Sequence, residues 1–150
     1  MDAAAVRKRI LEDHQVIRRL LTEVDALARR ALAGEDGLEA ELREAGERLR
    51  ERFLAHLALE DAHLVPALRV SDAWGDERAA RVEREHREQR AEMERLLGHL
   101  RDVRRGAREL AQELSDLVNG LVADMEREER AVLDPEVLRD DVIGVRVEGG

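Results

Sequence analysis

Apolar residues recur along the chain in steps of three, four and seven, the spacing that places them on one face of an α-helix. Four stretches carry this pattern, and glycine-containing breaks separate them. The pattern predicts helices at about residues 3–33, 38–68, 76–100 and 107–133. Because the connections are short, successive helices should run in opposite directions, giving an antiparallel up-down-up-down four-helix bundle.

The composition agrees with this helical interpretation. Hydrophobic residues make up 43% of the 150-residue chain and charged residues 41%, whereas aromatic residues make up only 1%. Alanine, leucine, glutamate and arginine, which favour helices, outnumber the β-branched and aromatic residues that favour strands. We therefore expect an all-α protein with a single domain.

Two prolines bear on where the helices end. Asp134–Pro135 should close the bundle, which divides the chain into a bundle at residues 1–135 and a C-terminal tail at residues 136–150. Pro66 should kink the second helix near its end or cost it about 3 kcal/mol. The sequence leaves open whether the tail packs on the bundle or remains mobile, although it contains the apolar residues Val142, Ile143, Val145 and Val147.

The charge pattern excludes some classes of partner. The formal net charge is −9, and basic residues are interspersed with acidic ones as on solvated helix faces, which argues against nucleic-acid binding. No stretch approaches the ~20 apolar residues that span a bilayer, and the amino terminus lacks the apolar run of a signal peptide. We therefore expect no membrane association and a cytoplasmic location.

Polar residues with metal-binding side chains interrupt the apolar stripe of each predicted helix. Two pairs of these residues, His56 with Glu60 and Asp124 with Glu128, are four residues apart in the sequence. Residues at this spacing in an α-helix differ by only ~40° around the helix axis and by ~6 Å along it, so both side chains of a pair can reach one metal centre. Burying several charges without a partner is expensive, and a cation would balance them. The expected metal ligands are His14, His56, Glu60, His86, Asp124 and Glu128.

The inward faces of the second and fourth helices define this expectation most fully. They are predicted to hold Leu42, Leu49, Phe53, His56, Glu60, His63 and Ala67, and Leu110, Leu114, Leu117, Leu121, Asp124, Glu128 and Val132, respectively. His63 has three possible roles: an extra ligand, a partner of a carboxylate ligand, or a residue at the end of the bundle. We favour the last two. His99 is expected at the surface or at a helix end.

A single histidine on an apolar helix face is more often a core residue than a ligand, but one such group on each of four helices is much less often accidental. The chain has no cysteine, so only imidazole and carboxylate groups can hold the metal. Such ligands suit iron, manganese or zinc better than copper(I) or an iron–sulfur cluster. The sequence therefore predicts a site for one of these three metals.

At these positions the chain resembles the hemerythrin-like HHE cation-binding domains, whose pattern is His … His-x3-Glu … His … His-x3-Glu on successive helices. His14 matches the first motif, His56-Leu57-Ala58-Leu59-Glu60 the second, with Val65-Pro66-Ala67-Leu68 behind it, and Glu85-His86-Arg87-Glu88 the third. The fourth motif ends at Glu128 but begins with Asp124, where the family has histidine. The resemblance covers about residues 10–133.

The resemblance implies a di-iron centre in which the two glutamates bridge the ions. One ion would take the histidines of the first two helices, and the other those of the third and fourth. Here Asp124 replaces one histidine, and Arg90 stands where the oxygen carriers have another. Asp124 would favour the oxidised metal and weaken reversible oxygen binding. The resemblance thus implies an altered di-iron centre, or one firm and one weak metal position.

The resemblance implies oxygen binding or sensing, a response to nitric oxide or peroxide, or iron handling. Because nothing in the sequence resembles a dedicated substrate pocket, a cofactor-binding loop or a nucleophile with its base, we expect a non-enzymatic protein that binds or senses oxygen or a related small diatomic ligand. The alternatives are an oxidoreductase acting on peroxide or nitric oxide, and a degenerate bundle that serves as an interaction protein. The sequence identifies no protein partner. A ferritin-like oxidase needs two Glu-x2-His motifs. Glu60-Asp61-Ala62-His63 supplies one, but the fourth helix supplies no second, so we reject this class.

Overall fold

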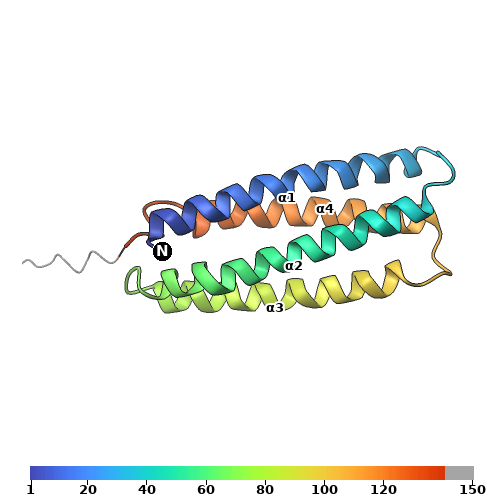
Figure 1. The fold of residues 1–150 in the computed structure, drawn as a ribbon. Coiled ribbons are helices and arrows are strands. Elements are labelled where there is room, and N and C mark those ends of the chain that lie inside the picture. Colours follow the sequence, from blue (N-terminus) through green and yellow to red (C-terminus); the bar gives the residue numbers. More distant parts are fainter. Residues whose placement is uncertain (141–150) are drawn as a thin grey trace, which may run out of the picture.

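The computed structural model describes residues 1–140, in which four helices form one antiparallel bundle (Figure 1). The helices are α1 (Ala3–Leu32), α2 (Glu39–Arg69), α3 (Gly75–Leu100) and α4 (Ala107–Ala131). Each predicted helix end lies within two residues of the observed one. The predicted all-α, up-down-up-down fold is therefore confirmed, and residues 1–140 contain no strand.

The connection between α1 and α2 depends on two glycines in the left-handed region of backbone space. Gly34 has φ 102° and Gly37 has φ 79°, values that L-residues with a side chain rarely adopt. The start of α1 is closed by Asp2, whose carboxylate accepts a hydrogen bond from the backbone N–H of Ala5 at 2.8 Å. Local chemistry thus fixes both ends of the first helix.

The apolar core is divided into two clusters along the bundle. The larger cluster extends from the middle of the bundle to the α1–α2 connection, and the smaller lies at the end that holds the amino terminus. On α1 the boundary falls between Ile10 and Ile17, and at the end of α4 it falls between Met125 and Val132, the residue that follows this helix. Five of the six predicted ligands lie at this boundary and form one polar layer across an otherwise apolar interior, namely His14, His56, Glu60, His86 and Glu128.

The inward face of α2 differs from its prediction beyond Glu60. His63 and Ala67 are only half-buried, whereas Leu64 and Leu68 are fully buried. Beyond Glu60 the buried residues of α2 follow in steps of four, at Leu64 and Leu68, and this side of the helix packs against its neighbours at this end of the bundle. Pro66 lies on the exposed side, and the helix continues past it to Arg69.

The beginning of the predicted tail packs on the bundle. Leu138 is completely buried in the smaller cluster, together with Ala3 and Val6 of α1. Arg7 reinforces this contact, since its guanidinium donates hydrogen bonds to the carbonyl oxygens of Leu133 and Leu138. The apolar residues Val142, Ile143, Val145 and Val147 lie outside the described residues.

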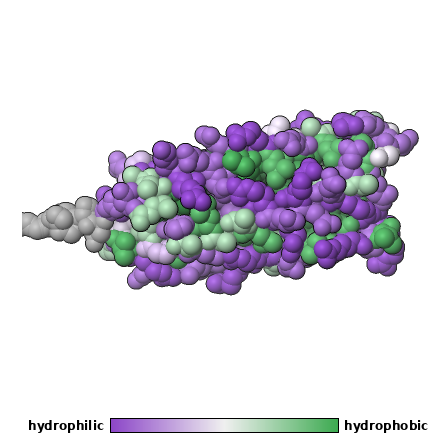
Figure 2. Space-filling model, in the orientation of Figure 1, coloured by the Kyte–Doolittle hydropathy of each residue, from purple (hydrophilic) through white to green (hydrophobic). Residues whose placement is uncertain are grey.

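The surface seen in Figure 2 is largely hydrophilic, with scattered apolar patches between the charged side chains. This agrees with the interspersed charges of the sequence. None of the helices in residues 1–140 is long and apolar enough to cross a membrane.

Gly75 provides a test of how tightly α2, its following turn and α3 are packed. A Cβ atom at Gly75 would lie 2.0 Å from the carbonyl oxygen of Leu68, so Gly75→Ala must displace backbone. We expect a loss of about 1–3 kcal/mol in the free energy of unfolding, measured by urea denaturation. Gly98→Ala on the same helix is the control, because nothing lies within 4 Å of its Cβ position. Equal stability of the two variants would contradict this packing.

Candidate metal centre

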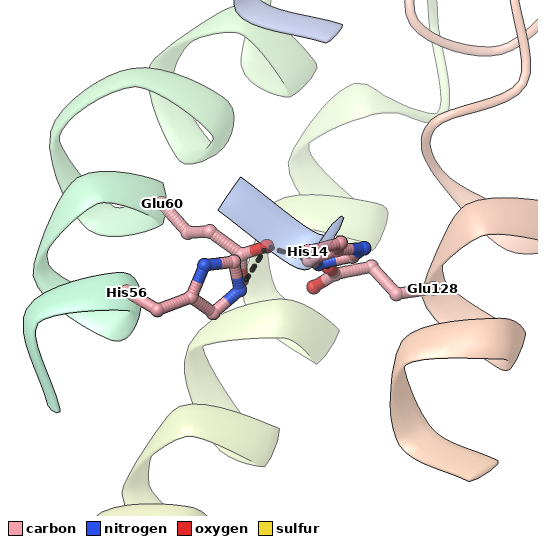
Figure 3. A group of neighbouring side chains, drawn as sticks. All are labelled: His14, His56, Glu60 and Glu128. Carbon is pink, nitrogen blue, oxygen red and sulfur yellow. Dashed lines mark ion pairs between the residues drawn. The ribbon is translucent and has the colours of Figure 1, made fainter. Parts of the chain in front are cut away.

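Four of the six predicted ligands converge in the polar layer. His14 comes from α1, His56 and Glu60 from α2, and Glu128 from α4, and one ligand atom of each lies within 4.8 Å of the others. Figure 3 shows the four side chains pointing toward one another. The four-residue spacing of His56 and Glu60 brings both to the same point, as expected from helix geometry.

The atoms that face one another are those that bind metals. His56 Nε2 lies 3.0 Å from Glu60 Oε2, and His14 Nε2 lies 3.0 Å from Glu128 Oε1 and 3.7 Å from Glu60 Oε2. The rings of His14 and His56 are tilted, with centroids 4.9 Å apart. Two imidazole nitrogens and two carboxylates thus surround one point from three helices.

His86 lies on the other side of Glu60. Its Nε2 atom is 2.9 Å from Glu60 Oε1, whereas the Oε2 atom of Glu60 faces His14 and His56. Glu60 and His86 are 1% and 2% exposed, so water reaches neither freely. A carboxylate with different partners at its two oxygens has the arrangement that bridging between two metal positions requires.

Two atoms at the centre are buried without a hydrogen-bond partner within the described residues, His14 Nε2 and Glu60 Oε2. The 3.0 Å separation of His14 Nε2 from Glu128 is therefore close in distance but poorly aligned for hydrogen bonding. An unpaired buried polar atom costs about 1–3 kcal/mol. A cation at the point where these atoms converge would satisfy both, so the residues fit a metal ion.

The centre also shifts the proton affinities of its members. Burial opposes protonation of the histidines, but the adjacent carboxylates outweigh it: Glu128 and Glu60 raise the pKa of His14 to about 10, and Asp13 and Glu60 raise the pKa of His56 to about 9. Burial opposes ionisation of Glu60, yet its contacts with Glu128 and the histidines hold its pKa well below the usual range. Burial and the charge of Glu60 raise the pKa of Glu128.

The other ring nitrogen of His56 is held by a carboxylate that the sequence analysis did not single out. His56 Nδ1 donates a hydrogen bond to Asp13 Oδ2 at 2.7 Å, and Arg52 pairs with the second oxygen of Asp13. Fixing Nδ1 as the donor leaves Nε2 free to bind a metal and sets the direction of the ring. Asp13 therefore orients His56.

The same arrangement occurs at the other two histidines of the layer. In each case a carboxylate accepts a hydrogen bond from Nδ1, and an arginine on the histidine's own helix pairs with that carboxylate. The sets are His14, Glu129 and Arg18, with 2.7 Å between Nδ1 and Oε2, and His86, Asp61 and Arg90, with 2.6 Å between Nδ1 and Oδ1.

A sequence signal for these partners does exist. Asp13, Asp61 and Glu129 are each the immediate chain neighbour of a predicted ligand, and each arginine is four residues from its histidine. In a chain with 41% charged residues such neighbours are common, so spacing alone does not separate them from solvated charges.

The structure does not place Asp124 or His63 among the converging side chains of the metal centre. Asp124 was expected on the inward face of α4, but its side chain is 32% exposed, and Met125 takes the buried position instead. One oxygen of Asp124 accepts a hydrogen bond from Gln89 Nε2 at 3.1 Å, and the other pairs with Arg127. The short aspartate side chain is held at the seam between α3 and α4, so its role as a sixth ligand stays a prediction.

Asp13→Asn should weaken metal binding about 10–100-fold, because an amide holds the His56 ring less firmly than a carboxylate paired with arginine. The affinity for Zn²⁺ can be measured by competition with a chelating dye. Asp25→Asn is the control, since Asp25 pairs with Arg29 on the same helix at 2.7 Å and has no part in the centre. Unchanged affinity in Asp13→Asn would show that this contact does not orient a ligand.

Comparison with known proteins agrees with this geometry. The chain matches the model of the hemerythrin HHE cation binding domain over residues 6–134. No curated protein and no solved structure shows a significant match. The matched range contains all of α1 except its first three residues, the whole of α2, α3 and α4, and every residue of the polar layer.

Proposed function

The chain belongs to the hemerythrin HHE cation-binding domain family, and from this we propose that it is a non-haem iron protein that binds or senses oxygen or a related small diatomic ligand. The observation that carries the proposal is the convergence of His14 Nε2 and Glu60 Oε2, both buried and unpaired, on one point of the bundle interior. Membership of a cation-binding family and the presence of buried, unpaired imidazole and carboxylate atoms both support a metal ion at this point.

Two metal positions of unequal strength follow from the donors available. His14, His56, Glu60 and Glu128 would hold the firm position. His86 and the second oxygen of Glu60 would supply a weaker one, because the Asp124 carboxylate is engaged elsewhere. The centre is therefore an altered one that holds one ion firmly and a second ion weakly.

The imidazole and carboxylate ligands suit iron, zinc and manganese alike, so we prefer iron on the basis of the family resemblance. An iron ion at the centre would supply the capacity to bind a diatomic ligand reversibly. The protein's own residues hold the donors in place and keep bulk water away. Asp13, Asp61 and Glu129 orient the three imidazoles, and the buried Phe53 and Leu57 border the layer.

The space beside the centre favours a very small ligand. A cavity of about 10 Å³ adjoins His56, Glu60 and Glu128, close to the room that one water molecule requires. A larger organic substrate does not fit without displacement of side chains. This supports a ligand binder over an enzyme with an organic substrate, while peroxide and nitric oxide remain small enough for the oxidoreductase alternative.

The test is the visible spectrum of the iron-loaded protein. An absorption band that appears with oxygen, disappears on deoxygenation and is absent from Glu60→Gln would support the proposal. Steady turnover of peroxide or nitric oxide without a reversible band would favour the oxidoreductase. Loss of both signals in a folded, iron-supplemented protein would favour the interaction protein.

A further inference from the structure

The cavity beside the centre extends to the seam between α3 and α4. Its inner wall contains Glu60 and Glu128, and its outer wall contains Glu85 and Gln89 of α3 and Asp124 of α4. The inner residues are buried or nearly so, whereas the three outer residues are partly exposed. The cavity therefore connects the buried layer with the outer edge of this seam.

The seam is the looser side of the bundle. α3 packs closely on α2, and α4 packs closely on α1, whereas α3 and α4 make little close backbone contact with each other. Across the seam, at the cavity, Gln89 Nε2 donates its hydrogen bond to Asp124 Oδ2 at 3.1 Å. Arg127 holds the other oxygen of Asp124, which fixes the carboxylate in place. One side-chain hydrogen bond therefore crosses the outer end of the cavity.

The charge of the lining indicates what can pass. Its ionisable members are the four carboxyl groups of Glu60, Glu85, Asp124 and Glu128 and the single imidazole of His56, so acidic groups predominate, and no lysine or arginine of the described residues lines it. Such a wall attracts cations, admits uncharged molecules and repels small anions. At about 10 Å³ the cavity is also too small for anything but an ion or a molecule of a few atoms.

We propose that the seam between α3 and α4 is the access route to the metal centre for cations and uncharged diatomic molecules, and that the Gln89–Asp124 hydrogen bond is its gate. This inference rests on the proposed metal-binding function. It gives Asp124 a role different from that of a ligand: the carboxylate controls passage from the rim. Because a gate is a kinetic barrier, it changes the rates of metal binding and release together and leaves the equilibrium affinity unchanged.

Stopped-flow measurements with Co²⁺, followed by its visible absorption, test the gate, with release measured into excess EDTA. Gln89→Ala removes the crossing hydrogen bond and keeps every carboxylate, so binding and release should both accelerate about tenfold. The amount of Co²⁺ bound and its affinity should stay within about threefold of the wild-type values. Gln112→Ala is the matched control, because Gln112 Nε2 donates to Asp116 at 3.0 Å away from the centre, and its rates should not change.

Asp124→Asn separates the gate from a ligand role. Asparagine retains an oxygen that can accept the hydrogen bond from Gln89. If Asp124 only gates access, the Co²⁺ affinity of the variant should stay within about threefold of the wild-type value. If Asp124 binds the metal, the affinity should fall more than about tenfold. Unchanged rates in Gln89→Ala, or a large loss of affinity in Asp124→Asn, would overturn the gate. Failure of the wild-type protein to bind Co²⁺ would instead overturn the proposed function, and the gate with it.

Discussion

Glu60→Gln is expected to weaken metal binding more than about 100-fold, the largest effect of any single change in the polar layer. Replacing a residue that only orients a ligand typically costs about 10–100-fold, and Glu60 is placed to bind directly. Within residues 1–140 it is the one residue in contact with all three histidines of the polar layer, since Oε2 faces His14 and His56 and Oε1 faces His86. Glutamine has the same size but lacks the negative charge that balances the cation.

The measurement is Zn²⁺ and Fe²⁺ affinity by competition with a chelator, together with the helical circular dichroism signal. Glu51→Gln makes the same chemical change at an exposed position of α2 and should leave affinity unchanged. If folded Glu60→Gln retains wild-type affinity, Glu60 is not a ligand and the proposed centre is wrong.

Metal affinity should also rise steeply with pH. In the metal-free protein the carboxylates raise the pKa of His14 to about 10 and that of His56 to about 9, so both imidazoles are protonated near neutrality. A metal must displace both protons, and each displaced proton changes the apparent affinity about tenfold per pH unit. We therefore expect an increase of about 100-fold per unit between about pH 6 and pH 8.

The stability of the metal-free protein should change in the opposite direction. Both histidines have a folded-state pKa above the usual 6.5, so their contribution is complete below about pH 6.5 and is lost as pH rises toward 9 and 10. Thermal melts with and without Zn²⁺ across this range test the linkage. A metal-induced rise in Tm that does not grow with pH would show that the imidazoles do not exchange protons for metal.

Helical periodicity was sufficient to predict the fold and the centre's main members. Steps of three and four identify which side of a helix faces inward, and the breaks at Gly34 and Gly106 separate the helices. Because His14, His56 and Glu128 each interrupt such a stripe, their convergence follows once the helices are antiparallel and in register.

Periodicity does not show which neighbouring helix a side chain meets. Asp13 and Glu129 lie beside inward positions and cross to a histidine on another helix, a contact set by the register between helices. Asp124 does not join the other ligands in the structure for a related reason, and its role as a ligand stays a prediction. It is one turn from Glu128, but its shorter side chain lies at the α3–α4 seam, where Gln89 and Arg127 offer partners closer than the centre.

The central claim is that the polar layer binds iron, and elemental analysis tests it most directly. The protein should be expressed in iron-supplemented medium, purified without a chelating tag and analysed for metals per chain. The account predicts about one iron ion per chain or more, since the firm position comprises His14, His56, Glu60 and Glu128. A folded protein that contains only trace metal, and takes up none when Fe²⁺ is added without oxygen, would contradict it.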